Sequence, residues 1–325
     1  SGYQSMKSNT TGSYNTAYGN RSFYSNTEGN FNTAYGRQSL YSNTTGLFNT
    51  ASGYQSLYSN TEGHSNTAYG YQSLRYNTTG VYNTAFGHLS LYSNTTGVGN
   101  TASGYSSLRY NTEGASNTTS GHYSLFRNTT GSKNTASGTS SLRNNTTGTN
   151  NTALGYESGD VITTGTNNVM LGYQTDPSAA DATNQIVIGK GATGHGDNIA
   201  VIGNGSATAI HPHDDNEVDL GSSTYEYKDL YVDGTAYVDA IGMGSTAMTL
   251  PTADGTANYV LKTDGGGTLS WTANSGSGAS AVNDLSDALI EDNSLYLGND
   301  PSGTTSTAEY NVAVGTTALD AITTG

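Results

Sequence analysis

Small and polar residues dominate this chain, and its apolar residues return at a fixed interval. From residue 2 to residue 189 a glycine occupies every seventeenth position, inside the pattern N-T-A-x-G-x-x-S-L-x-x-N-T-T/E-G-x-x. A repeat of this length is too short for a pair of helices, which needs about 33 residues or more. It is typical of one rung of a β-solenoid: two short strands, N-T-A-x and S-L-x-x, and two turns, hydrogen-bonded to the next rung at about 4.8 Å. The pattern therefore predicts an all-β fold, a parallel β-roll or β-solenoid of stacked 17-residue rungs.

One column of the stacked rungs carries a large apolar residue throughout. We expect the core to be built on this column, which includes Leu40, Leu57, Leu74, Leu91 and Leu108. A second column is almost uniformly alanine, and its small size indicates close approach, either across a thin roll or against a partner chain. The residue after each alanine varies, and strand alternation turns it to the opposite side. The two positions cannot both be core, and the sequence leaves open which of them faces inward.

Glycine and asparagine columns predict the turns and the contacts between rungs. Glycine adopts positive φ without steric cost, so we expect both glycine columns to supply turns. The first column includes Gly19, Gly36, Gly53, Gly70, Gly87 and Gly104. Two asparagine columns, which contain Asn26 and Asn32, place identical side chains over one another. Because stacked amides hydrogen-bond along cross-β structures, we expect two amide ladders.

The repeat changes after residue 189. Ile186–Gly189 recurs as Ala200–Gly203 at a spacing shortened by three positions, and the repeat stops near residue 209. Short alternating segments with Asp-Gly and Gly-Ser turns follow, and Gly298 and Gly315 are again separated by one full repeat period. We therefore predict a β-roll over 1–208, a β connector over 209–274, a Gly/Ser hinge with a short helical or irregular neck over 275–292, and the start of a second β-roll over 293–325.

The composition indicates that a single copy has a thin core. Of 325 residues, 43 are Gly, 33% are hydrophobic and 11% are charged, and the last two shares are well below those of ordinary globular domains. Ordering each residue costs about 1–2 kcal/mol, which one leucine per rung hardly offsets. We therefore expect an obligate homo-oligomer whose copies associate lengthwise. The absence of Cys excludes disulfides and thiolate sites, and no apolar stretch reaches the ~18 residues of a membrane span, so we expect no membrane insertion.

The charges are divided unevenly along the chain. Residues 1–158 hold eight Lys/Arg and four Asp/Glu, whereas the remainder holds three and 21. Nucleic-acid binding requires a basic stripe, and the acidic part argues against it. The six arginines of the repeat do not all share one column. We therefore expect them to form a solvated surface, and no nucleic-acid partner.

The repeats resemble those of a known class of fibrous proteins. Ile186–Gly189 and Asn198–Gly203 look like the head repeat of trimeric autotransporter adhesins (YadA-like heads), and the N-T-A-x-G…S-L…N-T-T-G units are similar to a variant found in phage tail fibres. The 219–233 and 250–271 segments resemble connectors of the same fibres. The resemblance implies a left-handed parallel β-roll, a homotrimer around one axis, and attachment to a host surface glycan or protein receptor. It also implies a virion tail fibre or extracellular, cell-surface location and other virion or filament proteins as partners. The chain departs from the adhesin pattern in its period, which is mostly seventeen positions rather than fourteen.

One cluster has the residue types of a metal site. His211 and His213 flank Pro212, and in an extended strand both imidazoles point the same way. Around a threefold axis they would supply six nitrogens to an axial transition metal, and some fibre tips of the resembling class use H-x-H in this way. The alternative is a polar loop with solvated histidines. The acidic 214–217 segment lacks EF-hand spacing, and we expect a solvated turn there. No other cofactor is predicted.

Tyrosines are the main candidates for receptor or glycan contact, namely Tyr24, Tyr41, Tyr58 and Tyr92. An amphipathic ring offers contact area and a hydrogen-bonding tip, although tyrosine columns that stack on themselves to stiffen the roll are the simpler interpretation. We expect a structural fibre and not an enzyme. The alternatives are a fibre-borne polysaccharide-degrading enzyme, for which the Glu28, Glu62 and Glu113 column would have to supply carboxylates, and an ice-binding solenoid built on the threonine column.

Overall fold

The computed structural model describes residues 2–207, 210, 220, 224–233, 240–243, 246–249, 251, 257, 259–266, 268–273, 288–291, 294–297 and 312–314. The chain divides into two compact units, Ser1–Glu217 and Val218–Gly325. All secondary-structure elements among the described residues are β-strands. The predicted metal ligands His211 and His213, the acidic 214–217 segment and the Gly/Ser stretch of the hinge all lie outside the described residues.

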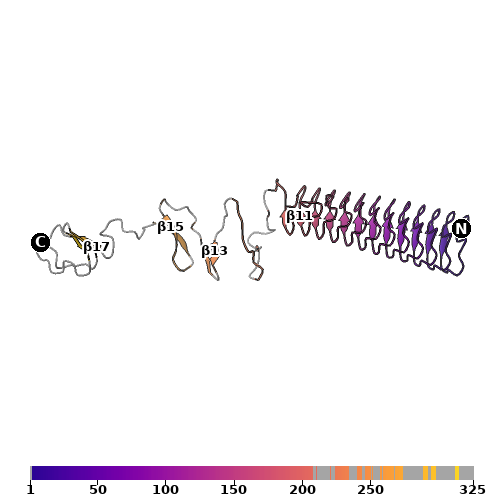
Figure 1. The fold of residues 1–325 in the computed structure, drawn as a ribbon, viewed down its shortest axis with the longest axis horizontal. Helices are drawn as coiled ribbons and strands as arrows, with labels where there is room; N and C mark the ends of the chain where they lie inside the picture. Colours follow the sequence, from indigo (N-terminus) through magenta and orange to yellow (C-terminus); the bar gives the residue numbers. More distant parts are fainter. Residues whose placement is uncertain are drawn as a thin grey trace. The chain divides into compact units, whose positions relative to one another are not determined.

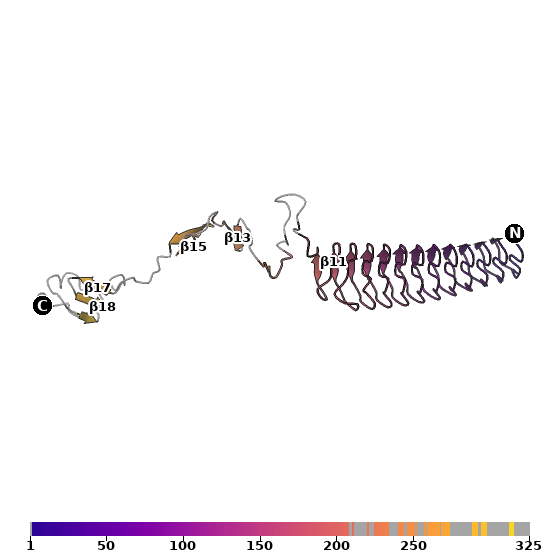
Figure 2. The ribbon, with the colours of Figure 1, turned by 90° about the horizontal axis from the view of Figure 1, so that it is seen from above.

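The first unit is a β-solenoid built on one parallel sheet of 12 strands in chain order. Figures 1 and 2 show these strands stacked as successive rungs. Neighbouring strands pair at an offset of one full repeat period, as in Ala34 with Ala51, until the last pair, where Ile186 meets Ala200 at the shorter spacing. The predicted fold and both periods are therefore confirmed. The strands are β1 (Thr16–Tyr18), β2 (Thr33–Tyr35), β3 (Thr50–Ser52), β4 (Thr67–Tyr69), β5 (Thr84–Phe86), β6 (Thr101–Ser103), β7 (Thr118–Ser120), β8 (Thr135–Ser137), β9 (Thr152–Leu154), β10 (Val169–Leu171), β11 (Ile186–Ile188) and β12 (Ala200–Ile202).

Each repeated rung has one strand and not the two that were predicted, because the S-L-x-x segment is curled. Gln38 and Leu40 take left-handed conformations, with φ of 59° and 48°. Between them, the Ser39 hydroxyl donates to the Gly36 carbonyl at 3.1 Å. The segment still bonds to the next rung, since the Leu40 N–H donates to the Ser56 carbonyl at 3.0 Å. Left-handed conformations cost non-glycine residues roughly 1–3 kcal/mol each, and the stack has to offset that cost in every rung.

The structure decides which strand position faces inward. In the repeated strands the middle residue is buried and its two neighbours are turned outward, as in β2. The alanine column therefore lines the core, opposite the predicted leucine column, and both are almost completely shielded from water. The core leucines are Leu40, Leu57, Leu74, Leu91 and Leu108, each 0% exposed. Small alanines on the strand side let the rung close tightly on one leucine per turn.

Two asparagine ladders run through the roll, as the stacked columns predict. In the first, the Asn77 side-chain amide donates to Asn60 Oδ1 at 2.8 Å and accepts from Asn94 at 2.8 Å. In the second, Asn49 donates from its side chain to Asn32 Oδ1 at 3.1 Å and to the Gly63 carbonyl at 2.8 Å. These amides are buried, and burial makes unpaired polar groups costly. The ladders therefore hold the rungs in register.

Only one of the two glycine columns has the predicted backbone conformation. The turn glycines Gly19, Gly36, Gly53, Gly70, Gly87 and Gly104 have φ between 126° and 139°. Gly46, in the second column, has no positive φ, so the expectation of a left-handed turn there is wrong. It is needed for space, because a Cβ would overlap the Asn43 side chain and the Gly63 carbonyl.

The second unit contains short paired strands. Two antiparallel hairpins, β13 (Ala240–Met243) with β14 (Thr246–Thr249) and β15 (Tyr259–Thr263) with β16 (Leu269–Ala273), fall within the predicted connector. Residues 224–233 carry no strand, contrary to expectation. The neck holds β17 (Ala288–Glu291) where a helical turn or irregular chain was expected, because its residues pair with β18 (Ser294–Leu297). β18 pairs in parallel with β19 (Val312–Val314), and partners such as Leu295 and Val312 are separated by the repeat period of the first roll.

Candidate functional site

Most cations of the roll, Lys133 excepted, lie in one segment of each rung, between the first glycine column and the asparagine that follows it. From residue 3 to residue 144 these segments contain no Asp or Glu. Their cations are Lys7, Arg21, Arg37, Arg75, Arg109, Arg127 and Arg143. All seven side chains are exposed or half-buried. We call this surface the basic face.

A single column on the basic face holds cations and aromatic rings, which alternate from Tyr58 to Arg143. We call it the cation–aromatic column, and it consists of Lys7, Tyr24, Tyr41, Tyr58, Arg75, Tyr92, Arg109, Phe126 and Arg143. The guanidinium of Arg75 lies 5.7 Å from the ring centre of Tyr58 and 5.9 Å from that of Tyr92. Arg109 lies 5.5 Å from Tyr92 on its other side. Such cation–π contacts stabilise by about 0.5–1 kcal/mol at exposed sites, and here they fix the direction of each arginine.

All four predicted contact tyrosines, Tyr24, Tyr41, Tyr58 and Tyr92, lie in this column and are half-buried. Tyr24, Tyr41 and Tyr58 stack with ring centres 5.0 Å apart and planes within 7° of parallel. Their faces therefore cover one another along the column. A ligand meets ring edges and hydroxyl groups, so the structural role and contact through the hydroxyl tips are compatible.

The arginines of the column are anchored, and Arg75 and Arg109 are not neutralised, whereas the charge of Arg143 interacts with that of Asp160. Nη1 of Arg75 donates to the Tyr92 hydroxyl at 3.0 Å. Within the described part of the chain, no Asp or Glu forms an ion pair with Arg75, Arg109 or Arg143. We expected a solvated surface here, because the six arginines of the repeat do not all share one column. The missed signal is the spacing, because Arg109 follows Arg75, and Arg143 follows Arg109, by two repeat periods.

A neighbouring aromatic column widens the basic face. His88 stacks between Tyr71 and Tyr105, with ring centres 4.9 Å from each. Tyr123 contacts Tyr105 at 5.6 Å and Phe126 of the cation–aromatic column at 4.9 Å. The two columns are thus in contact through Tyr123.

The basic face ends in a group of carboxylates. Asp160 occupies the next rung of the cation–aromatic column after Arg143, with Glu157 in the same rung. The pKa of Asp176 is raised to about 6, mainly by burial and to a smaller extent by the negative charge of Asp160. The pKa of Asp160 is also raised, mainly by burial and to a smaller extent by the charge of Glu157. Oδ1 of Asp176 accepts a long hydrogen bond, 3.4 Å, from the Val161 N–H. The surface therefore changes from positive to negative between residues 143 and 157.

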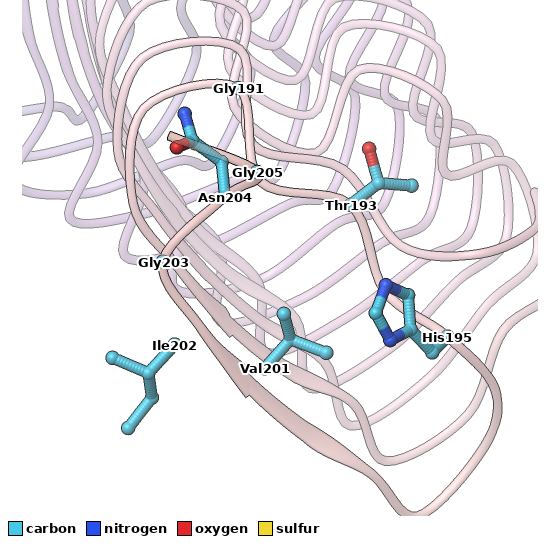
Figure 3. A pocket seen from close by; sticks show the side chains of 8 residues that line it. All are labelled: Gly191, Thr193, His195, Val201, Ile202, Gly203, Asn204 and Gly205. Atoms are coloured by element: carbon cyan, nitrogen blue, oxygen red, sulfur yellow. The ribbon is translucent and has the colours of Figure 1, made fainter. Parts of the chain in front are cut away.

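A pocket of about 510 Å³ lies at the last rung of the roll. Figure 3 shows Thr193 and His195 on one segment of its wall and Val201 on strand β12. Val201 packs against the core cluster, so the pocket continues the line of the core. Its lining residues include one histidine and no carboxylate, and we assign it no chemistry.

The remaining candidates do not assemble into a catalytic or metal site among the described residues. Glu28, Glu62 and Glu113 are exposed in one column, with at least one rung between any two of them. No group of three His, Asp or Glu side chains in the part of the chain that the structure covers is arranged to hold a metal ion.

Among the described residues, no helix has the length and the apolar composition that a membrane crossing requires. Comparison with protein-family models, with curated proteins and with solved structures finds no match to this chain.

Proposed function

We propose that this chain is a segment of a homotrimeric attachment fibre, carried on a virion tail or on a cell surface. One observation supports this most strongly: the outward face of the 12-stranded sheet carries large apolar side chains in two stretches, separated by the rungs of Ser103, Ser120 and Ser137. They include Tyr35, Phe86, Leu154 and Ile202, which are 55–57% exposed. A lengthwise partner would cover this face.

The size of that face favours association over a solvated surface. Each strand turns two residues outward, and near the end of the roll both are aliphatic, as with Ile186 and Ile188 in β11. Contiguous exposed apolar patches beyond a few hundred Å² are rare on monomers and typically mark interfaces. The sheet face repeats with each rung, so identical copies can pack along it with their rungs in register. The number three comes from the resemblance to trimeric adhesins and tail fibres.

The proposed role is structural. Rungs bonded backbone to backbone and side chain to side chain suit a stiff spacer that presents binding surfaces to a host glycan or protein receptor and joins other virion or filament proteins. A polysaccharide-degrading activity would require convergent carboxylates in a groove, typically about 5–9.5 Å apart. The exposed, separated Glu28, Glu62 and Glu113 do not support that alternative.

Mass measurement at low concentration tests the assembly. The proposal expects three times 33.6 kDa by sedimentation equilibrium and by native mass spectrometry, down to nanomolar protomer. A folded monomer under those conditions would refute it.

A pair of lysine variants tests which face is used. Leu154 lies on the sheet face, whereas Tyr156 lies on the same side of the rung as the basic face, in the acidic rung that follows it. The two side chains are 55% and 44% exposed. Leu154→Lys should dissociate the assembly, whereas Tyr156→Lys should leave its mass unchanged. The reverse result would move the interface to the basic face. Adhesion of the labelled trimer to candidate host cells then tests attachment itself.

A further inference from the structure

Three of the four cations of the cation–aromatic column, Arg75, Arg109 and Arg143, stand on alternate rungs. If the rung of Lys7 is the first, Arg75, Arg109 and Arg143 stand on the fifth, seventh and ninth. One rung rises about 4.8 Å, so cations two rungs apart are separated by about 10 Å along the roll. We infer that this column binds a linear acidic polysaccharide with one carboxylate in every disaccharide. The inference rests on the proposed attachment function and names the ligand of its basic face.

The period of the column matches such a chain. In an extended polysaccharide each sugar advances by about one rung, so a disaccharide advances by two. A carboxylate on every second sugar then meets a guanidinium on every second rung. Planar guanidinium groups bind carboxylates through two parallel hydrogen bonds. Among described residues no ion pair competes for Arg75 or Arg109, whereas Asp160 interacts with Arg143.

The rungs between the arginines suit the uncharged sugars. Tyr92 stands between Arg75 and Arg109, and Phe126 stands between Arg109 and Arg143. Tyr92 offers its hydroxyl, which accepts from Arg75, and Phe126 offers an apolar edge. The arginines are held by the rings beside them, so binding orders few side chains and loses little entropy.

Single-stranded nucleic acid fits this column less well. Its bases stack on open aromatic faces, whereas Tyr24, Tyr41 and Tyr58 cover one another's faces. The phosphates of a duplex wind around its axis, and a straight row of cations cannot follow them.

One end of the site is set by charge. Asp160 takes the next position of the column after Arg143, and Glu157 shares its rung. These carboxylates repel a polyanion, so the bound segment should end at Arg143 and extend from there along the column over Arg109 and Arg75.

The test uses labelled hyaluronan decasaccharide, in which glucuronate alternates with a neutral sugar, and the intact trimer. Three ligands of similar length serve for comparison: a neutral chito-oligosaccharide, oligoglutamate and oligothymidine. Fluorescence anisotropy at low and physiological salt should show binding of hyaluronan and none of the neutral sugar. Oligoglutamate and oligothymidine should bind at least about tenfold more weakly than hyaluronan.

Two triple variants separate spacing from total charge. R75Q/R109Q/R143Q removes the periodic guanidinium groups, and R21Q/R37Q/R127Q removes the same charge from the same face outside the column. Since a hydrogen bond to a charged group contributes roughly a factor of ten or more, the first variant should abolish binding. The second should weaken it only a few-fold. R75K/R109K/R143K keeps the positive charges but lacks the planar guanidinium groups, so its affinity for hyaluronan should lie between those of the two glutamine variants. Such intermediate binding would also exclude misfolding as the cause of the loss in R75Q/R109Q/R143Q.

The possible negative results distinguish the polysaccharide inference from the proposed function. No binding of hyaluronan, equal binding of any of the three comparison ligands, or equal losses in the two glutamine variants would overturn the inference. Tighter binding of oligothymidine would assign the face to nucleic acid instead. A trimer that fails this test but still adheres to host cells would leave the proposed function intact, whereas a monomer would refute the proposed function.

Discussion

Replacement of one ladder asparagine tests how the rungs hold together. The Asn77 side-chain amide donates to Asn60 Oδ1 at 2.8 Å and to the Gly80 carbonyl at 3.0 Å, and its oxygen accepts from Asn94 at 2.8 Å. Asn77→Ala deletes all three bonds in a site where Asn60, Asn77 and Asn94 are 0% exposed. Water cannot replace the lost partners without opening the roll.

The cost depends on which partners keep another bond. The Gly80 carbonyl still accepts from Asn66 at 2.8 Å, and Asn94 still donates to the Gly97 carbonyl at 3.1 Å. Among the described residues, Asn60 Oδ1 is left with no donor. One orphaned buried acceptor costs about 1–3 kcal/mol and each other lost bond about 1 kcal/mol. We therefore expect Asn77→Ala to lower the free energy of unfolding by about 4 kcal/mol.

Denaturation by guanidinium chloride, at one fixed protomer concentration, measures this loss. Asn20→Ala is the matched control, because Asn20 is exposed on the basic face, and it should change stability by less than about 0.5 kcal/mol. Since each rung contacts only its neighbours, amide exchange should accelerate most in the rungs beside residue 77. A change within about 0.5 kcal/mol of the wild type, the size expected for a surface substitution, would refute the view that the ladder stabilises the roll.

Three further changes test the core, the turn and the carboxylates. Leu74→Ala should cost about 3 kcal/mol, because Leu74 is 0% exposed and the cavity cannot fill; a loss below about 1 kcal/mol in the same denaturation assay would contradict its place in the core. Gly70→Ala should lower the free energy of unfolding by at least about 2 kcal/mol, because the φ of Gly70 is 132° and a Cβ would lie 2.5 Å from the Gly87 carbonyl oxygen. The control Gly205→Ala should leave stability unchanged, because nothing lies within 4 Å of the added Cβ. Equal shifts of the melting temperature in the two variants would show that the turn at Gly70 tolerates a side chain. The pKa of Asp176 is raised to about 6 in the fold, so the native state binds the extra proton and stability falls as pH rises from about 4 to 6. Asp176→Asn should remove that fall and stabilise the roll at pH 7 by about 1 kcal/mol after solvent screening, and an unchanged pH profile of unfolding would exclude the effect.

The regular spacing of identical residues in the sequence predicted much of the fold correctly. A strict period places identical residues over one another, and a stack of identical rungs is the simplest structure in which every ladder is satisfied at once. The parallel pairing, the buried Leu40 column, the amide ladders and the positive φ at Gly36 all follow from that repetition. The change of spacing after Ile186 likewise marked the pair of neighbouring strands in the 12-stranded sheet that has a shorter offset.

The direction of each side chain was decided only by the tertiary structure. Period alone does not say whether alanine or the residue after it faces inward, because both alternate equally well along a strand. The second predicted strand failed because Leu40 takes a left-handed conformation, which local propensity disfavours and which the closing of the rung around one leucine imposes. The cation–aromatic column was present in the sequence as a spacing, but its meaning depended on the curled segment holding Arg75 between two rings. Repetition determined the register of this protein, and closure of the rung determined what that register presents to solvent.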